Sequence, residues 1–258
     1  MRLFSAALDL LSEIFTFTRV KKLLLVFFLS ISFIVLSSRT VCEEPDSTAV
    51  RYTEEFVFSQ VPDSTELPSL LVLETALAGY EILNHEQAIT HTGIITIIDF
   101  SLPSDKERLW VLDLIHGKVL FHCLVSHGRN SGELMAEYFS NKPGSYASSP
   151  GFYATGETYI GRNGLSLFLD GLEAGINDNA RDRAIVMHGA GYVSPEYIRE
   201  YGRLGRSYGC PAVPEEMSRE IIQSIKGGSC LFIYAPVVSY ISNSQIITRI
   251  ISPTKGKA

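Results

Sequence analysis

The stretch from Tyr153 to Leu169, YATGETYIGRNGLSLFL, consists of two strand-like halves around the dipeptide Asn163-Gly164. Asn-Gly favours the positive φ angles of tight hairpin turns, so the stretch predicts an antiparallel β-hairpin. A second hairpin is expected around His116-Gly117, between the strand-like runs 108–115 and 118–125. Hairpins that are not interleaved with regular helical crossovers predict a domain that is mainly β with a few helices.

Three further short runs rich in β-branched residues, 94–100, 184–187 and 230–234, are expected to add strands. Helices are expected at 70–83, after Pro68, and at 215–226, before Gly227-Gly228. Both segments place apolar residues at helical spacing, as Met217, Ile221, Ile222 and Ile225 illustrate. The β-branched residues after Ser239 leave two alternatives for the end of the chain, an edge strand or an unstructured tail.

The composition excludes several classes of protein. The chain has 258 residues, of which 46% are hydrophobic and 19% are charged, so it can bury a core and is not predominantly disordered. Four cysteines are too few for a disulfide-stabilised scaffold. Residues 43–258 carry 17 basic and 26 acidic side chains. That net charge of −9 disfavours binding to nucleic acid or, by charge alone, to an anionic membrane.

The N-terminal segment resembles a targeting signal. Arg19, Lys21 and Lys22 precede fourteen uncharged residues, Leu23 to Leu36. A basic flank followed by an apolar core of this length is typical of a secretory signal peptide, and an uncleaved anchor is the alternative. We therefore expect a signal or anchor at 1–41, a linker and helix at 42–92, the main domain at 93–238 and a tail at 239–258. The mature protein would be exported to the periplasm or cell envelope.

Cys210 is the first candidate for chemistry, in Gly205-Arg206-Ser207-Tyr208-Gly209-Cys210-Pro211-Ala212. The flanking residues are polar and turn-forming, and the positive charge of Arg206 would favour the thiolate. By contrast, Cys123 and Cys230 lie inside apolar strands, where we expect them to be buried. A disulfide between those two stays open at this stage.

A cysteine nucleophile needs a base, and His188 is the candidate because it ends a predicted strand and opens into Gly189-Ala190-Gly191. His127 also follows a strand and either lines a site or caps a loop. The six histidines show neither H-x-x-x-H nor H-E-x-x-H spacing, and the cysteines show no C-x-x-C, so we expect no metal site and no cofactor.

These motifs together resemble the murein L,D-transpeptidase catalytic family. The family has a His-Gly followed, after a spacer, by Ser-His-Gly-Cys; this chain has His188-Gly189 and Ser207-Tyr208-Gly209-Cys210, with Tyr208 where the family has His. The segments 125–132, 151–167, 187–194 and 205–213 carry the resemblance, which extends over about 93–236. It implies an L,D-transpeptidase-like β-sandwich or barrel.

The resemblance also implies roles for individual residues. Cys210 would be the nucleophile and His188 its base, oriented by the carbonyl of Gly189. Backbone N–H groups of Gly209 and Cys210 would hold the oxyanion. We expect Arg206 and Arg129 to bind substrate carboxylates, and Ser207, Tyr208 and His127 to line the substrate site. The 22-residue step from His188 to Cys210 further predicts a flap at 192–203 over the site.

The implied activity is that of a cysteine acyltransferase acting on the peptide stems of peptidoglycan. It would form crosslinks between diaminopimelate residues through a thioester on tetrapeptide stems. Three alternatives stay open: an L,D-carboxypeptidase that trims stems, a catalytically weak murein-binding module, and a zinc peptidase.

Overall fold

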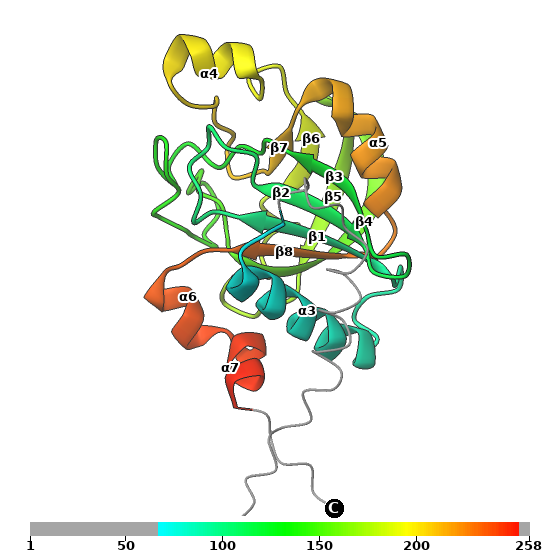
Figure 1. The fold of residues 1–258 in the computed structure, drawn as a ribbon. Coiled ribbons are helices and arrows are strands. Elements are labelled where there is room, and N and C mark those ends of the chain that lie inside the picture. Colours follow the sequence, from blue (N-terminus) through cyan, green and yellow to red (C-terminus); the bar gives the residue numbers. More distant parts are fainter. Residues whose placement is uncertain (1–66, 253–258) are drawn as a thin grey trace, which may run out of the picture. The chain divides into compact units, whose positions relative to one another are not determined.

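The computed structural model describes residues 67–252, and the expected signal or anchor and most of the linker lie outside them. Eight strands form one sheet in the order β3-β2-β1-β8-β4-β5-β6-β7 (Figure 1). Only β1–β8 and β6–β7 are parallel pairs among these strands, so the sheet is mainly antiparallel, and the prediction of a mainly β domain with a few helices is confirmed. The strands are β1 (Ile94–Asp99), β2 (Leu109–Asp113), β3 (Lys118–Cys123), β4 (Gly151–Gly161), β5 (Gly164–Gly171), β6 (Val186–Gly189), β7 (Ala212–Val213) and β8 (Cys230–Tyr234).

Both predicted hairpins are present. β2 pairs with β3 across the His116-Gly117 turn, and β4 pairs with β5 across the Asn163-Gly164 turn. The second turn begins one residue earlier than the dipeptide suggests, because Gly161 pairs with Gly164 and leaves Arg162 and Asn163 as the loop. Gly164 has φ +74°, the left-handed conformation that glycine adopts without steric cost.

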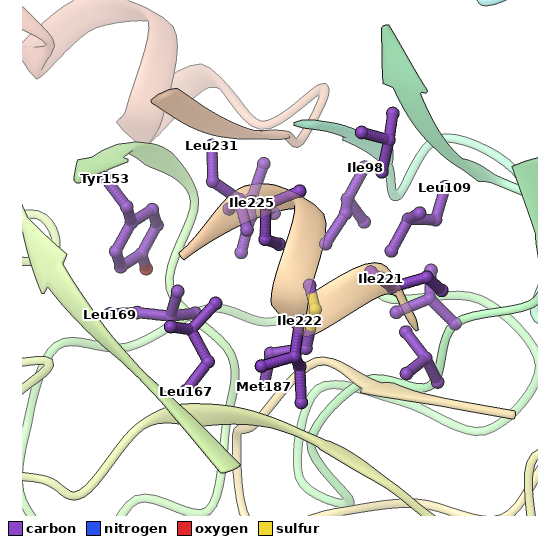
Figure 2. Packing of buried hydrophobic residues seen from close by; sticks show 14 of the residues in the cluster. Ile98, Leu109, Tyr153, Leu167, Leu169, Met187, Ile221, Ile222, Ile225 and Leu231 are labelled. Atoms are coloured by element: carbon purple, nitrogen blue, oxygen red, sulfur yellow. The ribbon is translucent and has the colours of Figure 1, made fainter. Parts of the chain in front are cut away.

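The central strands are buried on both faces, which explains their nearly continuous apolar sequences. Ile98 of β1 faces a core cluster on one side of the sheet, whereas Ile95 and Ile97 face a second cluster on the other. Helix α5 (Glu215–Ile225) covers the first face, where Ile221, Ile222 and Ile225 meet side chains of the strands (Figure 2). The predicted helix at 215–226 is therefore confirmed as a packing element.

Helix α3 (Leu70–His85) covers the opposite face and confirms the predicted helix at 70–83 (Figure 1). Two short helices, α6 (Val238–Asn243) and α7 (Gln245–Ile251), pack on the same side. The expectation of an edge strand or unstructured tail after Ser239 is therefore wrong for the described part of that segment. The β-branched composition was misleading, because Ile246, Ile247, Ile250 and Ile251 follow helical spacing.

A buried carboxylate anchors these C-terminal helices to the sheet. Glu173 is 4% exposed; it accepts hydrogen bonds from the backbone N–H of Phe152 at 2.9 Å and from the Tyr240 hydroxyl at 3.2 Å. The Ser244 hydroxyl, at the start of α7, also donates to Glu173. Burial raises the pKa of Glu173, and these donors lower it in part.

The two ends of the strand order approach each other and nearly close the sheet. Ser126, three residues beyond β3, forms an antiparallel bridge with Ala212 of β7, and Gly128 bridges Ser207 in parallel. We call this contact the seam, formed by residues 126–129 and 207–212. The seam brings together two segments that lie about 80 residues apart in the sequence, and one of them contains Cys210.

Candidate active site

A cavity of about 640 Å³ opens beside the seam. His188 and Cys210, from neighbouring segments of the sheet, both line it, together with Tyr208. Because β6 and β7 are parallel and His188 pairs with Ala212, the end of β6 lies next to the segment that leads from Cys210 into β7. The structure thus brings together the cysteine and the histidine that the sequence singled out.

The ring of His188 is fixed by its own strand. Nδ1 of His188 lies 2.9 Å from the carbonyl oxygen of Gly189, and a carbonyl oxygen accepts, so Nδ1 carries the proton. Nε2 is then the basic nitrogen of the neutral ring. His188 is 4% exposed, and burial lowers its pKa, which keeps the ring neutral near pH 7.

Cys210 is half-buried, with its thiol donating to the carbonyl oxygen of Ala184 at 3.7 Å. Burial raises the pKa of the Cys210 thiol. The N–H groups of Val186 and of Cys210 itself, together with the charge of Arg183, lower that pKa in part. Arg183 is therefore a cation that acts on the sulfur, whereas the expectation that Arg206 would favour the thiolate gains no support.

Arg183 is held in place by hydrogen bonds to the loop that precedes β4. Its guanidinium donates to the carbonyl oxygens of Ser140 at 2.8 Å and Ala147 at 2.6 Å. It also donates to the hydroxyl of Ser145 at 3.1 Å. The loop and the thiol therefore share one cation. No motif marks Arg183, whose only signal in the sequence is its place just before the strand that carries His188.

The backbone from Gly209 to Cys210 is held by two serines. Ser148 donates to the carbonyl oxygen of Gly209 at 3.1 Å, and the N–H of Gly209 donates to the Ser207 hydroxyl at 3.1 Å. Ser207 in turn donates to the carbonyl oxygen of Cys210 at 2.6 Å. Gly209 has φ +121°, and a Cβ there would lie 2.7 Å from the carbonyl oxygen of Ala147.

These contacts revise the expected oxyanion site. The N–H of Gly209 is already bound to Ser207, so it is not available to a substrate in this arrangement. In a trans peptide the N–H of Cys210 points away from the carbonyl of Gly209, which Ser148 fixes. Ser207 lines the cavity as expected, and its hydroxyl shapes this turn by donating to the carbonyl oxygen of Cys210 and accepting from the N–H of Gly209.

His127 does not line the cavity, contrary to the substrate-binding expectation. It is 1% exposed, its Nδ1 accepts from Arg108 at 2.8 Å, and its Nε2 lies 3.3 Å from the carbonyl oxygen of Gly132. Burial, and then the charge of Arg108, lowers the pKa of His127 to about 4. The loop-capping alternative is the one that the structure supports.

Four arginines line the cavity: Arg129, Arg162, Arg203 and Arg206. Glu133 pairs with Arg203 at 2.8 Å and with Arg206 at 2.7 Å. Arg206 also donates to the carbonyl oxygens of Arg129 and Gly132. Its expected role as a carboxylate ligand is therefore not supported, because its guanidinium is committed to Glu133 and to the loop.

The segment predicted as a flap contributes to the same cavity. It contains α4 (Pro195–Tyr201; Figure 1). Tyr192, Tyr197 and Arg203 line the cavity with Cys210. Burial and the nearby Cys210 raise the pKa of Tyr192 to about 12. The tyrosine hydroxyl therefore stays protonated at neutral pH beside the thiol.

The other cysteines and histidines of the described region form no comparable site. Cys123 and Cys230 are buried and free, and they belong to core clusters on opposite faces of the sheet. Within residues 67–252 no three histidine, cysteine or carboxylate side chains lie close enough together to hold a metal ion. No helix in that range is long and apolar enough to cross a membrane.

Comparisons with known proteins place these observations in a family. The model of the L,D-transpeptidase catalytic domain matches residues 66–234, which includes α3. No curated protein matches the chain significantly. Among solved structures, an L,D-transpeptidase from Mycobacterium smegmatis is 13% identical with a TM-score of 0.34. L,D-transpeptidase 3 from Mycobacterium tuberculosis is 12% identical with a TM-score of 0.36.

The helical cell shape determining protein from Campylobacter jejuni is 14% identical with a TM-score of 0.36. The alignment covers 55% of this chain and 59% of the M. smegmatis structure, and 55% of this chain and 61% of the M. tuberculosis structure. For the C. jejuni structure the values are 65% and 56%. This chain thus spans about three fifths of those proteins, and at these TM-scores the likeness is weak. The family match, which extends over most of the chain, shows that the protein belongs to the L,D-transpeptidase catalytic domain family.

Proposed function

We propose that this protein is a peptidoglycan L,D-transpeptidase that acts through a thioester on Cys210. The observation that carries the proposal is the fixed tautomer of His188. Its Nδ1–H is bound to the carbonyl of Gly189, and its basic Nε2 belongs to a ring that lines the same cavity as the thiol. A neutral imidazole beside a protonated thiol is suited to general-base activation of a nucleophile.

In the first half-reaction, His188 Nε2 takes the proton of Cys210 as the sulfur attacks the carbonyl carbon between diaminopimelate and the terminal D-Ala. The N–H of Cys210 is the backbone donor that we assign to the resulting oxyanion. A donor fixed before the reaction contributes about 3–4 kcal/mol to the transition state. Collapse of the intermediate breaks the C–N bond, His188 returns its proton to the leaving amine, and the acyl group stays on sulfur.

In the second half-reaction, the amine of another stem attacks the thioester, His188 takes a proton from that amine, and the Cys210 sulfur leaves. The product is a crosslink between two diaminopimelate residues. If water replaces the amine, the product is a trimmed stem, as in an L,D-carboxypeptidase. The cavity wall formed by Tyr192, Tyr197 and Arg203 is the surface that would admit an acceptor stem. The proposed partners are therefore peptidoglycan stems, and the proposed location is the periplasm or cell envelope.

The product masses test this function. The full-length protein is incubated with purified tetrapeptide-stem fragments, and we expect loss of D-Ala together with stem dimers. Loss of D-Ala without dimers would instead support the carboxypeptidase, and unchanged fragments that still bind would support the murein-binding module. Addition of a chelator serves as a control, because inhibition by chelation would favour the zinc peptidase.

The dependence of kcat/KM on pH tests the protonation states assigned here. Because the pKa of His188 is lowered, the base form persists on acidification, and we expect activity to fall only below about pH 6.5. Because the pKa of Cys210 is raised, no rise toward a thiolate form is expected between pH 7 and 8. An acidic limb well above pH 6.5 would contradict this assignment. Unfolding must be measured in parallel, since the low pKa of His127 predicts loss of stability in acid.

A further inference from the structure

Arg129 differs from two of the other three arginines of the cavity, Arg203 and Arg206, in its partners. Arg203 and Arg206 share the single carboxylate of Glu133, whereas within residues 67–252 no carboxylate lies at ion-pair distance from Arg129 or Arg162. No aspartate or glutamate lines the cavity. Positive charge is thus concentrated in the cavity beside Cys210, although the whole chain has a net charge of −6. This cavity would attract an anionic group.

Two tyrosines hold the guanidinium of Arg129 in place. Its Cζ lies 4.4 Å from the ring centre of Tyr146 and 4.8 Å from that of Tyr208, and the two ring centres are 4.8 Å apart. Stacking uses the flat faces of a guanidinium and leaves the N–H groups at its edge for a planar anion. A carboxylate can accept two parallel hydrogen bonds from that edge.

The backbone around this cluster is also fixed. The N–H of Arg129 donates to the carbonyl oxygen of Ser207 at 2.8 Å, which ties the arginine to the segment that contains Cys210. Tyr146 has φ +54°, a left-handed conformation that is unfavourable for a non-glycine residue. Its carbonyl oxygen accepts from the N–H of Asn130 at 3.1 Å, and the Asn130 side chain donates to Ser145 at 2.9 Å.

Tyr208 occupies the position where the family motif has histidine, and it is 64% exposed. A large exposed aromatic side chain gains little from its own burial, so its contacts with Arg129 and Tyr146 are its main interactions. We propose that Tyr208 and Tyr146 present Arg129 as a clamp for a carboxylate of the acyl-donor peptide. This proposal rests on the proposed function, since it assigns a substrate-binding role within the same site.

A stem peptide offers two carboxylates near the scissile amide: the C-terminal carboxylate of the leaving residue and the carboxylate on the distal centre of diaminopimelate. Both would bind a guanidinium edge in the same way. The clamp therefore predicts that the affinity for donor depends on Arg129, whereas the chemical step depends on Cys210 and His188. KM and kcat separate the two effects.

Kinetics of Arg129→Gln in the full-length protein test the clamp. We expect KM for the donor to rise by about 10- to 100-fold, with kcat within about threefold of wild type. Arg199→Gln is the matched control, because Arg199 is an exposed arginine of α4 outside the cavity. Tyr208→Ala should raise KM less than Arg129→Gln does, and Tyr208→Phe, which keeps the ring, should raise it less than Tyr208→Ala.

Donors amidated at one carboxylate at a time identify the ligand. Amidation of the bound carboxylate should weaken binding to wild type but add nothing to the loss in Arg129→Gln. If neither amide abolishes the difference between the two proteins, or if Arg129→Gln leaves KM within twofold of wild type, the clamp is wrong.

Calorimetric binding of the donor to Cys210→Ala, with and without Arg129→Gln, keeps the clamp separate from catalysis. If binding to Cys210→Ala depends on Arg129 but the wild-type protein shows no turnover, the proposed function is overturned and the clamp is supported. If the wild-type protein turns over donor but binding to Cys210→Ala does not depend on Arg129, the clamp alone is overturned.

Discussion

Cys210→Ala is expected to abolish release of D-Ala from tetrapeptide stems, with a fall in kcat of about 10⁴-fold or more. The reason is that the proposed route passes through a covalent thioester, and Cys210 is the only cysteine among the described residues that line the cavity with His188. The fold should persist, because Cys210 is half-buried at the cavity rather than packed in a core cluster.

Mass spectrometry gives a direct readout of the same change. After incubation with donor, trypsin should release residues 207–219 of the wild type carrying the acyl group, and the Cys210→Ala peptide should stay unmodified. Cys230→Ala is the matched control, because Cys230 is buried in the core cluster under α3 and does not line the cavity. We expect this variant to lose some stability but to keep its activity. Retained turnover in Cys210→Ala would rule out the thioester route.

Arg108→Ala is expected to lower the free energy of unfolding by about 3–5 kcal/mol. Arg108 is 0% exposed; it donates to Val125 O from Nε at 3.1 Å and to Leu102 O at 2.7 Å, and its Nη2 also contacts His127. Burial lowers its pKa to about 9, so it stays charged at neutral pH. Its removal would leave a cavity and several buried acceptors without donors.

Urea denaturation at pH 7 measures the loss. Arg108→Met restores much of the volume but none of the hydrogen bonds, so the difference between the two variants separates packing from polar contacts. Arg199→Ala should change stability by less than about 0.5 kcal/mol, because its ion pair with Glu196 is exposed. A loss below about 1 kcal/mol in Arg108→Ala would mean that the buried guanidinium gains nothing over its cost of desolvation.

Sequence motifs identified only some of the residues that form the site. The motif identified Cys210 and His188, and the structure places both at one cavity. The sequence was silent on Arg183, whose charge acts on the thiol, and on Ser148, which fixes the peptide before Cys210. Neither residue belongs to a motif, because each acts through a contact that only the folded loop 140–149 creates.

Two expected roles failed for a related reason. His127 and Arg206 have the chemistry of substrate ligands, but both already have partners inside the protein: His127 accepts from Arg108, and Arg206 pairs with Glu133. A partner that lies elsewhere in the chain cannot be assigned from local sequence. Arg129, by contrast, is surrounded by rings rather than carboxylates, and that difference exists only in three dimensions.

The sequence by itself determined seven of the eight described strands, the two hairpins, helices α3 and α5 and the family, because alternation, turn residues and motifs are local properties of the chain. Only the tertiary structure decided how the edges of the sheet meet, since the bridges from Ser126 to Ala212 and from Gly128 to Ser207 join distant segments. That seam determines which residues face the thiol. The tertiary structure also stabilises residues 246–251 as part of helix α7, because α3 and the face of the sheet that α3 covers offer their β-branched side chains an apolar surface.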